Sequence, residues 1–123
     1  MELHLEHERR SVTYARRWVL RQAAQAGVRG EAQAVVELLT SELVANAIHH
    51  GPPDGHIVVE ADVLDGHLHV TVHDDGAGSP VVRDPPPTEA GGRGLMLVDM
   101  LASAWGTTPG PGGGKGVWFS VAL

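Results

Sequence analysis

Two alternating segments joined by an Asp-Gly pair constrain the fold of this chain more than any other feature. Apolar and more polar residues alternate over residues 57–63, and the same pattern returns over residues 68–72. Asp65 and Gly66 lie between them, and such a pair fits a two-residue hairpin turn. Because each strand is apolar on one face only, that face must be covered by another element. The chain is therefore expected to place helices against an antiparallel hairpin.

The covering helices are predicted ahead of the hairpin. Apolar residues recur at helical spacing from Val12 to Ala26, and Gly27 follows in the position of a helix-ending glycine. A second helical segment of about 20 residues ends at Gly51 and the prolines after it. Its apolar face carries residues spaced by three and four, namely Val36, Leu39, Leu43 and Ala47.

The rest of the chain adds short elements at both ends. Residues 2–6 alternate and predict a strand, and residues 74–92 form a long segment rich in glycine and proline, of a length that is usually functional. Helical periodicity resumes over 92–105. Residues 106–116 form a glycine-rich turn region, and whether a further strand precedes the closing strand stays open. Residues 117–123 predict that closing strand. The expected fold is α+β in one domain, residues 1–123: a two-layer sandwich of a mostly antiparallel, mixed sheet with helices on one face.

Charge and composition exclude several classes of function. The net charge is −6, with nine basic residues against fifteen acidic ones, whereas a nucleic-acid binder needs an excess of Lys and Arg. The absence of cysteine excludes disulfides and thiolate metal sites. The charged N-terminus is unlike a signal peptide, and no apolar run approaches the roughly 20 residues of a membrane span. We expect a cytoplasmic protein without direct nucleic-acid or membrane partners.

Glu42 and Asn46 lie four residues apart in the second helical segment, so their side chains stack on one face beside the apolar one. A carboxylate and an amide in this position suggest the floor of a polar pocket. There the Asn46 oxygen would hold Mg²⁺, which takes hard oxygen ligands and keeps waters. A pair of solvated surface residues would give the same pattern. His49 and His50 follow at the helix C-terminus, which favours imidazole, and adjacent histidines of a helix cannot reach one metal ion.

Two glycine-containing segments flank the long Gly/Pro-rich stretch. "DDGAG" at 74–78 follows the last alternating strand, where an ordinary turn would use the same residue types. "GGRGL" at 91–95 opens a helical segment, and bare N–H groups at a helix N-terminus form a phosphate site, although a capping loop looks the same. Along the chain, Glu42 and Asn46 are followed by the first glycine segment, the long Gly/Pro-rich stretch and the second glycine segment. This order is expected to supply the metal ligand, the group that recognises the base, the lid and the phosphate-binding turn of a nucleotide site.

With these motifs the sequence resembles the ATP-binding domain of the GHKL superfamily, which has the Bergerat fold and includes DNA gyrase and histidine kinases. It is most similar to the stand-alone branch of anti-sigma-factor serine/threonine kinases. "SELVANAIHHG" resembles the N box, "VHDDGAG" and "GRGLMLVDMLASAWG" resemble the two glycine boxes, and "GGGKGVWFSVAL" resembles the closing strands. The resemblance implies ATP and Mg²⁺ as cofactors, a lid over about residues 76–92, and a sigma factor or an anti-anti-sigma-like protein as partner.

The resemblance also implies roles for single residues. Glu42 falls on the general base, Asn46 on the Mg²⁺ ligand, and Asp74 on the carboxylate that accepts a hydrogen bond from the adenine amino group. The other residues implied in nucleotide binding are His50, Gly76, Gly78, Gly92, Arg93, Gly94 and Leu95. The family commonly has a Thr in its last box that supports the adenine-binding Asp. Gly116 stands at this place, and its missing hydroxyl predicts weaker adenine binding or a substituting water.

Three functions fit these motifs. The main expectation is a kinase that phosphorylates an anti-anti-sigma-like partner, and the alternative is a module that binds ATP and sequesters a partner without catalysis. A detached histidine-kinase domain with His7 as acceptor would need a dimerisation hairpin ahead of it, and six residues precede His7. The first strand is an edge strand, so a homodimer through it stays open.

Overall fold

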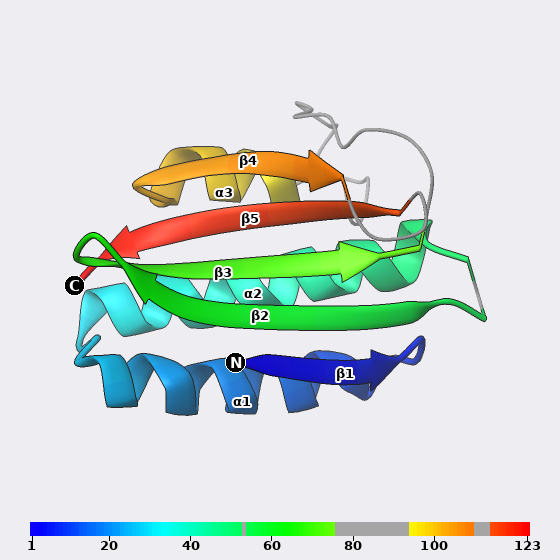
Figure 1. The fold of residues 1–123 in the computed structure, drawn as a ribbon, viewed down its shortest axis with the longest axis horizontal. Helices are drawn as coiled ribbons and strands as arrows, with labels where there is room; N and C mark the ends of the chain where they lie inside the picture. Colours follow the sequence, from blue (N-terminus) through cyan, green and yellow to red (C-terminus); the bar gives the residue numbers. More distant parts are fainter. Residues whose placement is uncertain (53, 76–93, 110–113) are drawn as a thin grey trace.

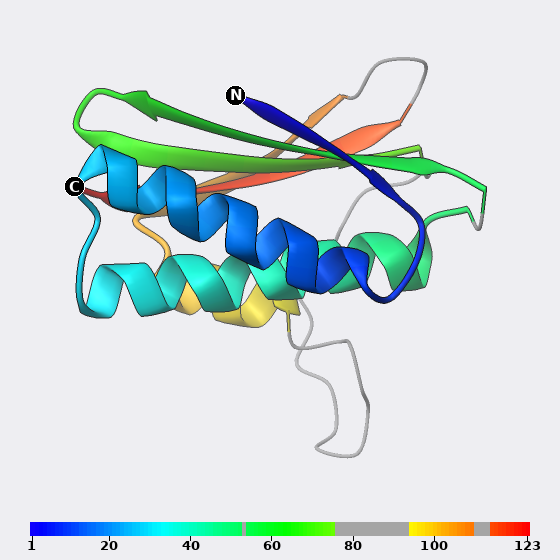
Figure 2. The same ribbon diagram turned by 90° about the horizontal axis from the view of Figure 1, so that it is seen from below.

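A five-stranded sheet with three helices on one face forms the part of the chain that the computed structural model describes, residues 1–52, 54–75, 94–109 and 114–123 (Figures 1 and 2). The strand order is β1-β2-β3-β5-β4, and each of these pairings is antiparallel. The predicted two-layer α+β architecture is confirmed. In chain order the elements are β1 (Glu2–Glu6), α1 (Ser11–Ala26), α2 (Glu31–His50), β2 (His56–Leu64), β3 (His67–Asp74), α3 (Gly94–Leu101), β4 (Ala104–Pro109) and β5 (Lys115–Ala122).

The predicted hairpin between β2 and β3 is confirmed in its turn residues. Asp65 and Gly66 have φ values of 53° and 73°. A two-residue turn with positive φ at both positions matches the right-handed twist of the strands that it joins. The register that follows places Val59 opposite Val72 and Val63 opposite Leu68, so apolar residues of both strands face the same side.

That apolar side packs against the helices and forms the core. Along β3 the buried residues are every second one, ending at Asp74, and the residues between them are half-buried on the open face. α1 ends at Gly27, whose φ of 90° is left-handed and whose N–H donates to the Ala24 carbonyl at 3.1 Å, as the sequence predicts. The buried face of α2 consists of Val36, Leu39, Thr40, Leu43, Val44 and Ala47. Within the described ranges, no helix is long and apolar enough to cross a membrane.

The predicted helical segment over 92–105 is too long, and the predicted turn region over 106–116 holds part of the further strand that the sequence left open. α3 ends at Leu101, and residues 104–109 form β4, which pairs with β5. Gly106 lies against the indole of Trp118 on β5, because a Cβ on this glycine would lie 2.9 Å from the indole Nε1. The glycine therefore makes room for a cross-strand contact inside a strand, although the same residue type usually indicates a turn.

Candidate functional site

Glu42 and Asn46 lie on the side of α2 that is turned away from α1. Glu37 marks the α1 side, because its Oε1 lies 3.8 Å from Nε of Arg16 on α1. At 3.6 residues per turn, Asn46 is rotated about 180° from Glu37 around the helix axis, and Glu42 about 140°. α3 lies along α2 opposite α1 (Figure 1). Both polar side chains therefore project to the side on which α3 packs.

The two side chains are half-buried and keep their polar atoms available. Among the described residues, neither Glu42 nor Asn46 has a hydrogen bond or ion pair with another residue. A polar group that is partly withdrawn from water is usually satisfied by protein, water or a ligand. Glu42 and Asn46 are therefore free to accept a ligand's donor or a cation, which fits an oxygen-preferring ion such as Mg²⁺.

Asp74 is the buried carboxylate of the site. It is the last residue of β3, is 8% exposed, and belongs to the same alternating set as Val72, so it faces the helix layer. Its Cα partners are Ile57 on β2 and Lys115 on β5. Lys115 is the sole lysine of the chain and lies on the same face as Asp74. No sequence motif indicates this lysine, since only the strand register brings it opposite the carboxylate.

Asp75 has a separate role, which no sequence motif indicates. Its Oδ2 accepts a hydrogen bond of 2.8 Å from the backbone N–H of His56. The contact ties the end of β3 to the start of β2, just beyond the last ladder pair. Gly55 and Gly114 allow the backbone to close around this point, because a Cβ on Gly114 would clash with the Asp74 carbonyl and one on Gly55 would lie 3.2 Å from Asp75 Oδ2.

The start of α3 supplies the remaining described part of the site. Gly94 is the first helical residue, and the first N–H groups of a helix have no partner within it. The side chain of Leu95 is 8% exposed and belongs to the core, so only its backbone N–H is suited to contact a phosphate. Four of the predicted site residues lie outside the described ranges, namely Gly76, Gly78, Gly92 and Arg93; so does the predicted lid over residues 76–92.

The histidines at the end of α2 are exposed and contact each other. The ring centroids of His49 and His50 lie 4.6 Å apart in an edge-to-face arrangement. No group of three or more His, Asp or Glu side chains among the described residues is arranged to hold a metal ion. Mg²⁺ does not require such a cluster, since it commonly uses one or two protein oxygens together with substrate phosphates and water.

Gly116 lies on the opposite face of the sheet from Asp74. It pairs with His73 on β3 and Thr108 on β4, and a Cβ on it would lie 2.8 Å from His73 Nδ1 and from Thr108 Cγ2. Side chains alternate along a strand, so a hydroxyl at residue 116 would point away from Asp74. The interpretation of Gly116 as a missing support of Asp74 is therefore wrong, and this glycine predicts no loss of adenine affinity.

The elements that carry these parts run in related directions. Figure 1 shows the end of β3, the C-terminal end of α2 and the N-terminal end of α3 directed to the same side. The sheet thus contributes a buried carboxylate, α2 contributes an amide and a carboxylate, and α3 contributes the first N–H groups of a helix. Such a set can accept hydrogen bonds from a base, hold a divalent cation and bind an anion.

Comparison with known proteins gives a consistent family. Residues 5–120 match the family model of the histidine kinase-like ATPase domain. The chain is 32% identical over 111 residues to the anti-sigma F factor of Geobacillus stearothermophilus, a match that covers 80% of this chain and 76% of that protein. The anti-sigma F factor of Geobacillus thermodenitrificans is 30% identical over the same length.

Solved structures of histidine kinases share the fold. The histidine kinase domain of a blue-light activated histidine kinase from Erythrobacter litoralis has a TM-score of 0.58 and 26% identity; the match covers 91% of this chain and 61% of that one. The mycobacterial sensor histidine kinase MprB has a TM-score of 0.58 at 15% identity, with 99% and 97% covered. At this lower identity the likeness concerns the fold alone.

Proposed function

The chain belongs to the family of histidine kinase-like ATPase domains, and from this membership we propose that it is an ATP-dependent serine/threonine protein kinase of the anti-sigma-factor type. Its substrate is a Ser or Thr hydroxyl of an anti-anti-sigma-like protein partner, and residues 1–123 act as one ATP-binding domain. The observation that carries the proposal is the pair of half-buried polar side chains on α2, Glu42 and Asn46, which have no hydrogen bond or ion pair within the described ranges, together with the buried carboxylate of Asp74 at the end of β3.

Asp74 selects the base. Its carboxylate accepts a hydrogen bond from the exocyclic amino group of adenine, whereas guanine has a carbonyl oxygen at the equivalent position. A carbonyl facing a carboxylate leaves both acceptors without a donor, which costs about 1–3 kcal/mol for a buried group. The burial of Asp74 supports this role, because water then has little room to replace the missing donor.

Glu42 acts as the general base for phosphoryl transfer. The partner hydroxyl oxygen forms a bond to the γ-phosphorus while the bond from phosphorus to the β,γ-bridging oxygen breaks and ADP leaves. Glu42 accepts the proton that the hydroxyl loses, so charge and atoms balance. Phosphoryl transfer depends mainly on positioning and charge neutralisation, and the N–H groups at the start of α3 would hold phosphate oxygens.

Asn46 would hold Mg²⁺ through its side-chain oxygen. When bound, the ion neutralises negative charge on the β- and γ-phosphates. The amide suits this role because it offers a hard oxygen ligand and, among the described residues, has no competing hydrogen bond.

The test is transfer of labelled γ-phosphate from ATP to an anti-anti-sigma-like protein. Glu42→Gln is expected to lower the rate constant about 100-fold to 10,000-fold, the usual contribution of a general base. Its affinity for ATP should stay within about threefold of the wild type, since the base contacts the hydroxyl and not the nucleotide. Rates are measured at saturating ATP, and affinity by calorimetry.

Glu37→Gln is the matched control, because it changes the same residue type on the opposite side of the same helix. It is expected to transfer phosphate at the wild-type rate. Wild-type transfer by Glu42→Gln would contradict the role of Glu42. ATP binding without transfer to any partner tested would contradict the kinase proposal and favour the alternative, an ATP-dependent module that sequesters its partner.

A further inference from the structure

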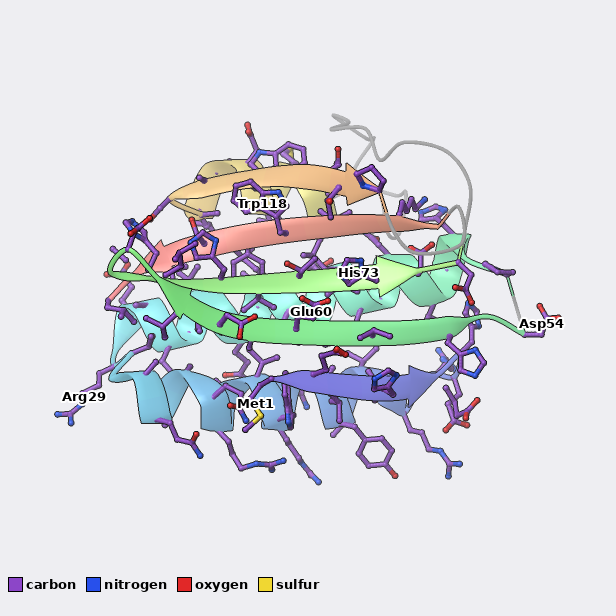
Figure 3. The ribbon with its side chains drawn as sticks, viewed as in Figure 1. Met1, Arg29, Asp54, Glu60, His73 and Trp118 are labelled. Atoms are coloured by element: carbon purple, nitrogen blue, oxygen red, sulfur yellow. The ribbon has the colours of Figure 1, made fainter. Side chains whose placement is uncertain are left out.

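The end of β3 carries a second pair of polar side chains, on the face of the sheet opposite Asp74. Nε2 of His73 lies 3.0 Å from Oε1 of Glu60 on β2; the two side chains are 17% and 39% exposed. His73 pairs with Val58 and Glu60 with Thr71, so the contact runs diagonally between the strands. Figure 3 shows Glu60 and His73 together on the face that the helices leave open.

One ring nitrogen of His73 is held by this contact. A carboxylate only accepts hydrogen bonds, so Nε2 is the nitrogen that donates to Glu60. Nδ1 is buried and has no hydrogen-bond partner in the described part of the chain. The orientation of the imidazole therefore depends on Glu60 at one end and on packing at the other.

The packing partner is the bare backbone of Gly116 on β5. A Cβ at this position would lie 2.8 Å from Nδ1 and 3.0 Å from Cε1 of His73, and 2.8 Å from Cγ2 of Thr108 on β4. The imidazole thus occupies space that any other residue at 116 would need. The ring of His73 therefore contacts both neighbouring strands, β2 and β5, one residue before Asp74, where His73 pairs with Val58 and Gly116.

We propose that His73 is a positioning residue for the nucleotide site. Its ring is held between Glu60 and the backbone of Gly116, and it thereby sets the backbone orientation at the end of β3. This orientation determines the direction in which the Asp74 side chain projects from the opposite face of the sheet. The two residues share one planar peptide group, so a rotation of the backbone at His73 turns Asp74 as well. This inference rests on the proposed function, since it takes Asp74 as the adenine-reading group.

The test compares the dissociation constants for Mg-ATP and Mg-GTP by titration calorimetry. His73→Ala is expected to lower the preference for ATP over GTP about fivefold or more, the fold-change of one lost hydrogen bond. His73→Gln keeps an N–H that can donate to Glu60 and is expected to retain most of the preference. A purely structural role would weaken both nucleotides alike and leave the ratio unchanged. Glu60→Ala removes the contact from the other side and should act like His73→Ala, even if His73→Ala does not fold.

His69→Ala is the matched control, because it removes the same residue type from the same face of the same strand. Its ring lies against Trp118, with centroids 6.0 Å apart, and it is expected to keep the wild-type preference. An unchanged preference in both His73→Ala and Glu60→Ala, with the preference lost in Asp74→Asn, would overturn the positioning role and leave the proposed function standing. A wild-type preference in Asp74→Asn would contradict the proposed function, and this inference with it.

Discussion

At the scale of single residues, two neighbouring carboxylates at the end of β3 have different surroundings. Asp74 is buried against the helix layer, and Asp75 is exposed and accepts the His56 N–H. The alternation of Leu68, Val70 and Val72 predicts that Asp74 joins the apolar face, because residue 74 has the same parity. The sequence could not predict that Lys115 lies opposite, since that depends on the pairing of β3 with a strand 40 residues later.

Gly116 illustrates that the spacing of residues in a motif does not determine which face of the sheet a side chain occupies. The motif places residue 116 near Asp74 along the sheet, and the register confirms the proximity, because Gly116 pairs with the preceding residue, His73. A shift of one residue along a strand, however, moves a side chain to the other face. Residue identity and spacing alone do not decide the face until the register is known.

Asp75→Ala tests the contact that ties β3 to β2. The substitution removes a hydrogen bond with a charged acceptor at 2.8 Å and is expected to lower the free energy of unfolding by about 1–2 kcal/mol. Urea denaturation measures the change, and the slope of the transition should stay constant. Asp75→Asn retains an oxygen acceptor and should lose less than half as much. Equal stability of Asp75→Ala and the wild type would show that the contact contributes nothing.

At the scale of elements, α2 and the β2–β3 hairpin could be predicted because their signals are local. Periodicity defines the buried face of the helix, and Asp65-Gly66 defines the turn. The position of β4 could not be predicted, although a further strand was left open there, because its Gly and Thr residues resemble a turn and pairing with β5 stabilises them as a strand. The helical periodicity of the preceding residues also continues past Leu101, where α3 ends.

Replacement of the buried Thr40 on α2 is predicted to stabilise the fold. The residue is fully buried, and its hydroxyl has no hydrogen-bond partner among the described residues. Thr40→Val replaces the unsatisfied hydroxyl with a methyl group of similar size and is expected to raise the free energy of unfolding by about 1 kcal/mol. Thr40→Ser keeps the hydroxyl, removes a buried methyl group and should lower it by about 1 kcal/mol. A destabilised Thr40→Val variant would indicate that the hydroxyl is satisfied.

At the scale of the whole molecule, the order of motifs predicts the site better than any one motif does. The helix that carries Glu42 and Asn46, the strand that ends at Asp74 and the helix that begins at Gly94 are far apart in the sequence, yet the C-terminal end of α2, the end of β3 and the start of α3 are directed to the same side (Figure 1). The insertion of β5 between β3 and β4 could not be predicted, because strand order depends on contacts between distant segments. That insertion places Lys115 and Gly116 beside the residues that end β3.

The central claim is that this end of the molecule binds ATP through adenine recognition by Asp74. Titration calorimetry of the wild type and Asp74→Asn with Mg-ATP and Mg-GTP tests it most directly. The wild type is expected to bind ATP in preference to GTP. Asp74→Asn keeps an oxygen that can accept from the adenine amino group but adds an N–H that can donate to the guanine carbonyl, so its preference for ATP over GTP is expected to fall about tenfold or more. Absence of nucleotide binding by the wild type, or an unchanged preference in Asp74→Asn, would contradict the claim.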